Sequence, residues 1–241
     1  MKLKELLIRV RKFHYKFITL TILVLLYFLL TAMSNNPTII LQKNEWMKLP
    51  EPHFKNATDG KVSKQITEVK LKSDEQYLSV EFDCQQNPFV AQNTYNQHNS
   101  EMYNQEVFEL FIAEGEKTPT RYLELEINPN NVIFAGWIEN PTKEAPKSCE
   151  FVEHEAAKII HSITKTNNSW SGKMQIPWTL LGEKREIYRI NFYRIISLKS
   201  HTKPDWKGTP ASCAYLCWSP TMSGETPRFH RPDAFGLLKI E

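Results

Sequence analysis

The segment Tyr122-Leu-Glu-Leu-Glu-Ile-Asn128 decides the fold class, because apolar and polar side chains alternate along it without a break. A period of two is the pattern of a β-strand that buries only one of its faces. The three aliphatic side chains would enter a core, and the remaining side chains would share the opposite face. That second face carries Tyr122, Glu124, Glu126 and Asn128.

The same alternation recurs along most of the chain, in short segments separated by Pro, Asn and Gly. Nine or ten such segments, with no long helical pattern after residue 34, predict an all-β fold. We expect an antiparallel β-sandwich, with an irregular insertion at residues 143–158. The predicted strands are residues 77–83, 107–112, 122–128, 132–137, 157–164, 170–176, 188–198, 214–218 and 235–240.

The N-terminus has the pattern of an export signal or a membrane anchor. Residues 1–16 hold six basic side chains and one acid, and residues 17–33 contain no charged side chain. This order predicts that the N-terminus faces the cytoplasm and that the rest of the chain lies outside it, in the periplasm or at the cell surface. Ala32-Met33-Ser34 is a candidate cleavage site, so a cleaved signal peptide and a single retained anchor both stay open.

We therefore divide the chain into three parts. Residues 1–34 are the basic flank with the signal peptide or signal-anchor helix, residues 35–45 are a polar linker, and residues 46–241 are the sandwich. The chain carries a net charge of +3, of which residues 1–16 contribute +5, so the remainder is mildly acidic at −2. A mildly acidic exported domain is a poor binder of nucleic acid.

The four cysteines show no Cys-x-x-Cys spacing that would indicate a metal site. An exported protein can form disulfides, so one or two are open here. Cys213 and Cys217 lie four residues apart in a predicted strand, which would separate them by about 13 Å. We expect that they do not pair with each other.

A loop rich in aromatic and arginine side chains lies between the last two predicted strands. Its three prolines and Gly224 exclude a regular helix or a central strand. Binding residues concentrate on such loops when a rigid scaffold holds them. The side chains presented on this irregular backbone are Trp218, Arg228, Phe229, His230 and Arg231.

Carboxylates, amides and arginines beside aromatic rings suit a sugar ligand. Sugar hydroxyls need paired donors and acceptors, and the C–H faces of a pyranose stack on aromatic planes. The polar face of residues 122–128 and the polar side chains of residues 189–194 supply such groups.

Several segments, in this order, resemble family 9 carbohydrate-binding modules, and in particular the stand-alone exported proteins of this type that are common in Bacteroidetes. The similarity spans about residues 46–241. It implies a DOMON-like β-sandwich that binds sugar chains or their ends between aromatic side chains and catalyses nothing. The matching segments are Val107-Phe-Glu-Leu-Phe-Ile112, Tyr122-Leu-Glu-Leu-Glu-Ile-Asn-Pro129, Met174-Gln-Ile-Pro-Trp178, Arg189-Ile-Asn-Phe-Tyr-Arg194, Trp218-Ser-Pro220 and Phe229-His-Arg-Pro-Asp-Ala-Phe-Gly236.

The resemblance also implies candidate site residues. The two aromatic positions that hold the sugar in the family match Tyr103 and Trp218, and the acidic position matches Glu109. Family 9 modules can hold structural calcium, but the sequence has no dense run of calcium ligands of the EF-hand kind, so calcium stays unassigned. The further candidates for polar contacts are Arg194, Arg228 and His230.

Other functions remain open beside non-catalytic sugar binding. Glu124 and Glu126, about 7 Å apart on one strand face, could serve an inverting glycosidase. A haem-binding electron-transfer module could use Met102, Met222 or His230 as ligands. A third alternative is a module that only docks a partner protein. We expect binding of an oligo- or polysaccharide without turnover, in support of polysaccharide breakdown and alongside a glycoside hydrolase.

Overall fold

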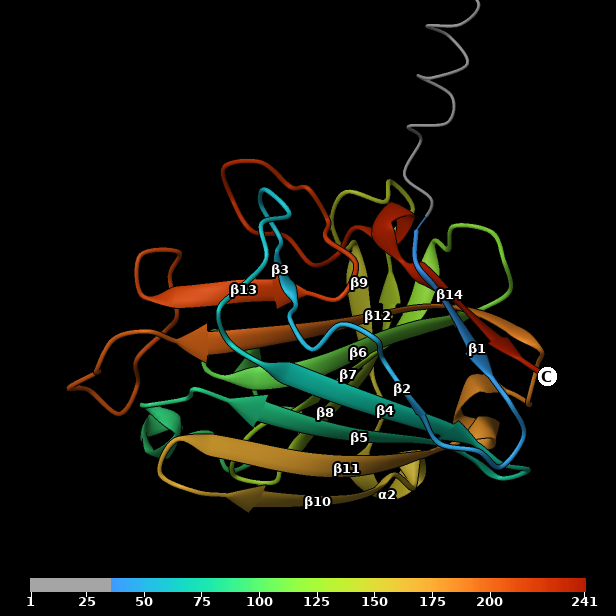
Figure 1. Cartoon of the computed structure of the whole chain (residues 1–241), viewed down its shortest axis with the longest axis horizontal. Helices are drawn as coiled ribbons and strands as arrows, with labels where there is room; N and C mark the ends of the chain where they lie inside the picture. The colour runs from blue at the N-terminus through green and yellow to red at the C-terminus, as the bar shows by residue number, and fades with distance from the viewer. Residues whose placement is uncertain (1–35) are drawn as a thin grey trace, which may run out of the picture. The chain divides into compact units, whose positions relative to one another are not determined.

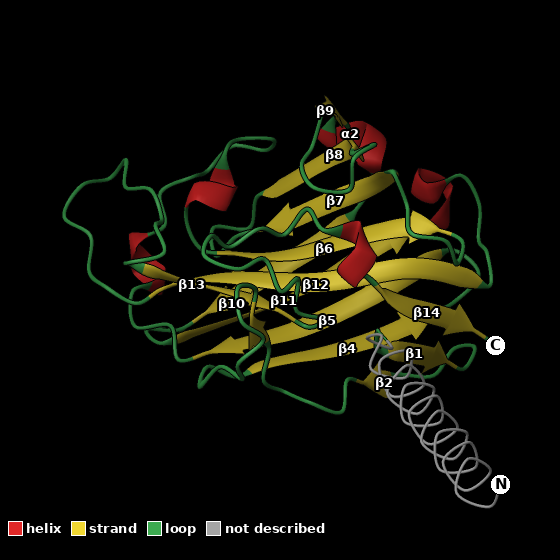
Figure 2. Cartoon of the chain, turned by 90° about the horizontal axis from the view of Figure 1, so that it is seen from above, coloured by secondary structure: helices red, strands yellow, loops and turns green. Residues whose placement is uncertain are grey.

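The computed structural model describes residues 36–241, which form two stacked β-sheets (Figure 1). The large sheet has nine strands, with the main order β1-β14-β12-β6-β7-β8-β9 (Figure 2), and β13 and β3 attached through β12. The small sheet has five strands in the order β10-β11-β5-β4-β2. This architecture confirms the predicted β-sandwich.

The bounds of the elements follow the sequence pattern closely. The large sheet contains β1 (Thr38–Leu41), β3 (Lys55–Asn56), β6 (Val107–Glu114), β7 (Arg121–Ile127), β8 (Ile133–Glu139), β9 (Ser148–Phe151), β12 (Ile187–Ser197), β13 (Cys213–Cys217) and β14 (Gly236–Ile240). The small sheet contains β2 (Met47–Lys48), β4 (Thr67–Ser73), β5 (Tyr77–Gln85), β10 (Ile160–Lys165) and β11 (Ser169–Pro177). The short helices are η1 (Val90–Gln92), η2 (Met102–Asn104), α2 (His154–Ala157), η3 (Trp178–Leu181) and η4 (Pro232–Ala234).

Several segments differ from the expectation. The strands β2, β3 and β4 were not among the predicted ones, although Thr67–Ser73 alternates in burial along its length. Residues 38–41, inside the predicted linker 35–45, form β1, because Ile39 and Leu41 alternate into the core while the strand pairs with β14. This pair is parallel, whereas the other paired strands of the described region are antiparallel. Residues 143–158, predicted as an irregular insertion, contain β9 and α2.

The predicted signal or anchor, residues 1–34, lies outside the described residues. Within residues 36–241, none of the helices has the length and the apolar character needed to cross a membrane. All four cysteines are free, and Cys213 and Cys217 lie on one strand without pairing, as expected.

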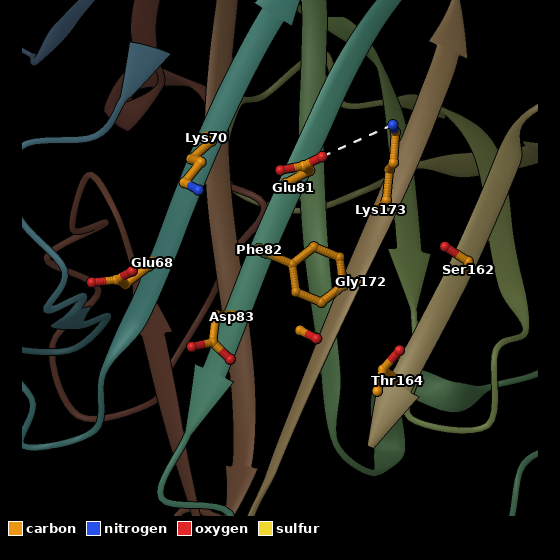
Figure 3. A pocket seen from close by; sticks show the side chains of 10 residues that line it. Glu68, Lys70, Glu81, Phe82, Asp83, Ser162, Thr164, Gly172 and Lys173 are labelled. Carbon is orange, nitrogen blue, oxygen red and sulfur yellow. Dashed lines mark ion pairs between the residues drawn. The ribbon is translucent and has the colours of Figure 1, made fainter. Parts of the chain in front are cut away.

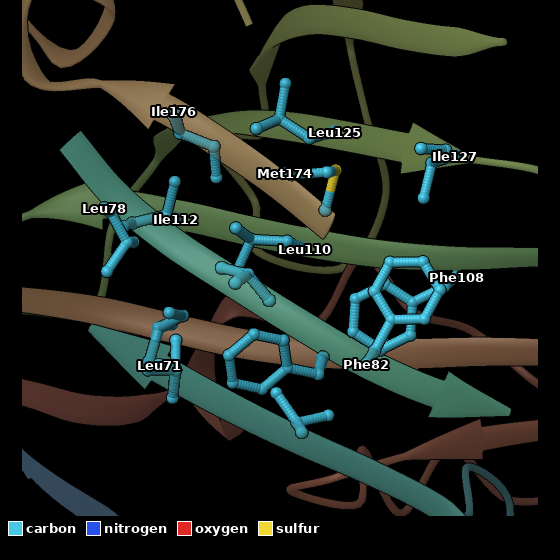
Figure 4. Packing of buried hydrophobic residues seen from close by; sticks show 14 of the residues in the cluster. Leu71, Leu78, Phe82, Phe108, Leu110, Ile112, Leu125, Ile127, Met174 and Ile176 are labelled. Carbon is cyan, nitrogen blue, oxygen red and sulfur yellow. The ribbon is translucent and has the colours of Figure 1, made fainter. Parts of the chain in front are cut away.

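The main core fills the space between the two sheets, as Figure 4 shows for its central part. Phe82 of the small sheet stacks on Phe108 of the large sheet, with ring centroids 4.1 Å apart. Around this pair, Leu110, Ile112 and Leu125 of the large sheet face Leu78 and other aliphatic side chains of the small sheet. Such burial, at about 25 cal/mol per Å² of apolar surface, is the main force that holds two sheets together.

A second apolar cluster lies on the other side of the large sheet. We call this side the outer face, because it is turned away from the small sheet. Phe111, Tyr122, Tyr193 and Phe235 are fully buried there. The central strands of the large sheet therefore bury side chains on both faces, and polar side chains on the outer face are not simply solvated.

Candidate functional site

A pocket of about 470 Å³ opens on the outer face of the large sheet. This volume lies in the range of small-molecule sites. Strands β6, β7, β8, β9, β12 and β13 contribute its floor and walls, and loops 140–147 and 218–231 close its sides. Its aromatic lining residues are Tyr103, Phe134, Phe151, Tyr215 and Phe229, and its polar ones are Glu109, Glu124, Glu144, Cys149, Arg228 and His230.

Two aromatic rings stand exposed at this pocket. Tyr103 is 43% exposed and Phe151 is 55% exposed. The ring of Phe134 packs edge-on against both, with centroid distances of 6.5 Å to Tyr103 and 5.5 Å to Phe151. These three rings form a continuous aromatic wall, and large exposed apolar side chains gathered at one place indicate a binding surface.

The floor of the pocket carries acidic groups that the strand register brings together. Glu109 on β6 lies opposite Glu126 on β7, and Glu124 follows on the same face. We call Glu109, Glu124 and Glu126 the glutamate cluster. All three side chains are buried, and one oxygen of Glu109 and both oxygens of Glu126 lack a nitrogen or hydroxyl donor.

Burial determines the protonation of this cluster. It raises the pKa of Glu124 to about 8, and burial together with the neighbouring carboxylates raises the pKa of Glu109 and of Glu126 well above the usual value. Glu124 and Glu126 lie two residues apart on one face of β7, and the charge of one carboxylate favours a proton on the other. Protonated carboxyl groups can both donate to and accept from a ligand hydroxyl.

His230 lines the pocket beside Glu124 and is held in place by two hydrogen bonds. Its Nδ1 lies 2.8 Å from the hydroxyl of Tyr122, and the amide of Asn140 donates to its backbone carbonyl over 3.0 Å. Burial lowers the pKa of His230 to about 4, so the ring is neutral at pH 7. The 4.0 Å approach of its Nε2 to Glu124 is therefore not an ion pair at that pH, and Nε2 can bind a ligand.

Two arginines lie at the mouth of the pocket. Arg231 forms ion pairs with Glu144 and Asp233, both at 3.2 Å, and so ties loop 218–231 to loop 140–147. Arg228 is exposed, and its guanidinium has no ion-pair partner among residues 36–241. The guanidinium of Arg228 offers hydrogen-bond donors at the mouth of the pocket. The carboxyl groups on the floor, when protonated, offer both donors and acceptors.

The structure brings four of the six predicted site residues together. Tyr103, Glu109, Arg228 and His230 all line this pocket. Arg194 and Trp218 do not line it.

Arg194 points toward the small sheet and is fully buried. It donates hydrogen bonds to the backbone carbonyls of Ile66 and Gln85 over 2.7 and 2.8 Å, and to the side chains of Thr67 and Asn87. It therefore joins β12 of the large sheet to the ends of β4 and β5 in the small sheet.

Trp218 also packs on the inner side of the large sheet. Its ring meets Phe192 edge-on at 5.9 Å, and a side chain at Gly236 would collide with it. Glycine at position 236 thus leaves the space that the indole fills. The side chain covers one end of the main core and is not available as a wall of the pocket.

Sequence reasoning singled out Tyr103 and Phe229 but missed the other aromatic residues of the pocket, which are Phe134, Phe151 and Tyr215. Phe151 lies in the segment predicted as irregular, and Phe134 alternates outward from a strand that was predicted correctly. The alternation of side chains along β8 could have placed Phe134 on the outer face. No local sequence signal could have shown that β9 pairs with β8.

The geometry weighs against the two cofactor or enzyme alternatives. Glu124 and Glu126 lie on one face of a single strand, so both carboxyl groups reach a ligand from the same side, whereas the acid and the base of an inverting glycosidase flank the bond that is cut. Of the proposed haem ligands, Met102 is fully buried, Met222 is 61% exposed, and only His230 lines the pocket.

A second hollow lies on the small sheet and differs in character (Figure 3). Its lining is mostly charged or hydroxylated, with Glu81 and Lys173 3.9 Å apart across two strands. Phe82 is its aromatic side chain, and that ring is almost fully buried because it packs under Gly172. This hollow lacks the exposed rings of the pocket on the large sheet.

Comparison with known proteins gives relatives in sequence and in structure. A protein named "Extracellular protein" from Arthroderma benhamiae is 30% identical over 184 residues, which cover 72% of this chain and 82% of that protein. No protein-family model matches the chain.

Among solved structures, a protein from Bacteroides uniformis that is named as a candidate carbohydrate-binding protein superposes with a TM-score of 0.61. It is 14% identical, and the match covers 85% of this chain and 99% of that one. A family 9 carbohydrate-binding module from Caldicellulosiruptor kristjanssonii in complex with glucose has a TM-score of 0.52 at 13% identity, covering 85% and 96% of the two chains. The same organism's family 9 module with cellotriose gives 0.50 at 14%, covering 85% and 94%. The chain has the fold of these modules.

Proposed function

This chain belongs to the protein family of the Arthroderma benhamiae extracellular protein, and from that premise we propose that it binds carbohydrate without chemical turnover. The binding site is the pocket on the outer face of the large sheet. The observation that carries the proposal is the meeting of exposed aromatic rings with buried carboxyl groups in one cavity.

The ligand would use the two kinds of surface differently. A pyranose ring would stack its C–H face on Tyr103 or Phe151, which stand exposed at the wall. Its hydroxyls would reach the glutamate cluster and His230, and Arg228 would contact hydroxyls at the mouth. Solved family 9 modules with the same fold hold glucose and cellotriose, which makes these two sugars the first probes.

Calorimetric titration with a sugar panel that includes glucose and cellotriose tests the proposal. We expect Tyr103→Ala to weaken binding about tenfold, or about 1.4 kcal/mol, because the stacking ring is lost. Trp46→Ala is the matched control, because Trp46 is also 43% exposed but lies outside the pocket. Equal affinity in Tyr103→Ala and the parent protein would refute the assignment, and release of shorter sugars during incubation would point to a glycosidase.

We further propose that the protein works outside the cytoplasm, in the periplasm or at the cell surface, and supports polysaccharide breakdown beside a glycoside hydrolase. The basic flank and the uncharged segment 17–33 support the export, and the relative's name is consistent with it. Cell fractionation and N-terminal sequencing of the mature protein would check the location and distinguish a cleaved signal from an anchor.

A further inference from the structure

Three histidines from separate parts of the chain meet away from the pocket. His98 lies in loop 93–101, His154 is the first residue of α2, and His161 lies on β10; α2 and β10 are labelled in Figure 1. One ring nitrogen from each lies within 4.8 Å of those of the other two. The rings of His98 and His154 stack at 3.7 Å, and His161 meets both edge-on.

The hydrogen bonds of these rings leave nitrogens available to a ligand. His161 donates from Nδ1 to the side-chain oxygen of Asn131 over 2.9 Å, so its Nε2 carries a lone pair. Metal-binding histidines are typically oriented by such a bond from the nitrogen that does not touch the metal. His154 has a buried Nδ1 with no partner at all.

His98 is differently placed. Its Nδ1 accepts a hydrogen bond from the backbone N–H of Ile133 over 3.0 Å, so the neutral ring carries its proton on Nε2. To bind through Nε2, His98 must give up this bond and move the proton to Nδ1. His98 is also the exposed member of the three, which leaves a path from solvent into the cluster.

We propose that His98, His154 and His161 form a binding site for a divalent transition-metal ion of the zinc type. Imidazole nitrogens are the ligands that Zn²⁺, Ni²⁺ and Cu²⁺ prefer over Ca²⁺ and Mg²⁺, and three histidines with one open position are a known coordination set for zinc. The ion would fasten loop 93–101 to α2 and β10, which lie next to one another only in the folded chain.

The burial of His154 is a further observation at this cluster. Its Nδ1 is buried without a hydrogen-bond partner, and an unpaired buried polar atom is costly unless a ligand or a water satisfies it.

Titration of the full chain with Zn²⁺ alone, in a protein without a histidine tag, tests the site. We expect one ion per chain and a rise in melting temperature that a chelator reverses. His154→Gln and His161→Gln should each weaken binding at least tenfold, and His98→Gln less, because His98 must first break a hydrogen bond. His53→Gln, which removes a histidine outside the cluster, should bind as the parent does.

A second variant keeps the test clear of misfolding. Asn131 has a positive φ of 61°, so Asn131→Gly keeps the backbone conformation and removes only the oxygen that orients His161. Loss of such an orienting partner typically costs 10- to 100-fold in metal affinity. Absence of Zn²⁺ binding by the parent chain, or equal binding by His154→Gln and His161→Gln, would overturn the proposal. Neither outcome would bear on the sugar pocket.

Discussion

Two buried groups of charged side chains lie on opposite faces of the large sheet and differ in how they are satisfied. On the inner side, the Arg194 network consists of Arg194, Asn87 and Glu106. Asn87 accepts from Arg194 and donates to Glu106 over 2.6 Å, while the backbone N–H of Ser197 donates to Glu106 over 2.7 Å. In this network, the Nε of Arg194 is the buried side-chain atom that lacks a partner.

The glutamate cluster on the outer face has the opposite character. Three of its carboxyl oxygens are buried without a nitrogen or hydroxyl donor, and burial, together with neighbouring carboxylates, raises the pKa of Glu109 and of Glu126. Unsatisfied buried polar atoms are costly and rare in folded proteins, so each one needs a reason. The comparison teaches that a buried charged side chain does not by itself indicate a binding site. A binding site is indicated when buried polar groups lack hydrogen-bond partners and lie at an open pocket.

Removing the arginine of the satisfied network should have the largest effect. We expect Arg194→Met to lower the free energy of unfolding by about 3–5 kcal/mol, because it leaves Glu106 buried without its countercharge. Urea unfolding would measure this. Arg121→Met is the control, since Arg121 is about half exposed in its ion pair with Glu139 and should cost less than about 1 kcal/mol. Similar losses in both variants would contradict the comparison.

The glutamate cluster should instead make the free energy of unfolding depend on pH. The folded-state pKa of Glu124 is raised to about 8, so the folded chain binds more protons than the unfolded chain and loses stability as pH rises toward 8. His161 and His230, with pKa values lowered to about 4, act in the opposite direction, but only below about pH 6.5.

Between pH 6.5 and 8, the titration of the carboxyl groups therefore changes the stability without an opposing contribution from His161 and His230. We expect the parent protein to lose about 1–2 kcal/mol across this window, and Glu124→Gln to flatten the loss. Chemical denaturation at several pH values would measure it. A stability that stays constant over the same window would show that the cluster is already ionised in the folded protein.

A smaller effect concerns ligand affinity. Burial raises the pKa of Glu109 well above its usual value, which favours the neutral carboxyl group, and glutamine has nearly the same shape. We expect Glu109→Gln to change sugar affinity by less than about threefold and Glu109→Ala to weaken it about tenfold. Calorimetry at pH 7 would compare them, and a strong loss in Glu109→Gln would indicate that a carboxylate binds the sugar.

The smallest expected effect is chemical. Cys149 lines the pocket as the exposed one of the four cysteines, but burial of its thiol and the nearby Glu124 raise its pKa to about 11. Because the thiolate is the reactive form, we expect slow alkylation at pH 7 and faster alkylation above pH 9. Mass spectrometry would follow the modification, and bound sugar should slow it. Rapid labelling at Cys213 or Cys217 instead would contradict the burial of β13.

Much of the fold could be predicted from the sequence because the period of two is strong in the long strands. The same parity could also have placed two site candidates correctly. Arg194 shares a face with Ile190 and Phe192, which are apolar and lie in the main core. Trp218 likewise lies two residues after Leu216, on the face that enters the main core.

The rest depends on which strands become neighbours. The pairing of Glu109 with Glu126 requires the register of β6 and β7. The aromatic wall requires β9 to join the sheet edge, and the histidine cluster requires three separate segments to meet. Long-range pairing of this kind leaves no local signal. Residues 38–41 were assigned to a linker because their alternation is too short to stand out from a polar surrounding.

The parallel pairing of β1 with β14 has a mechanical consequence. Thr38 lies beside Leu237 and Leu41 beside Ile240, so the described chain begins at one end of this strand pair and finishes at the other. A force that pulls residue 38 away from residue 241 would act along the strands, and their hydrogen bonds would resist it together in shear. In an antiparallel pair pulled at the same end, these bonds would break one after another.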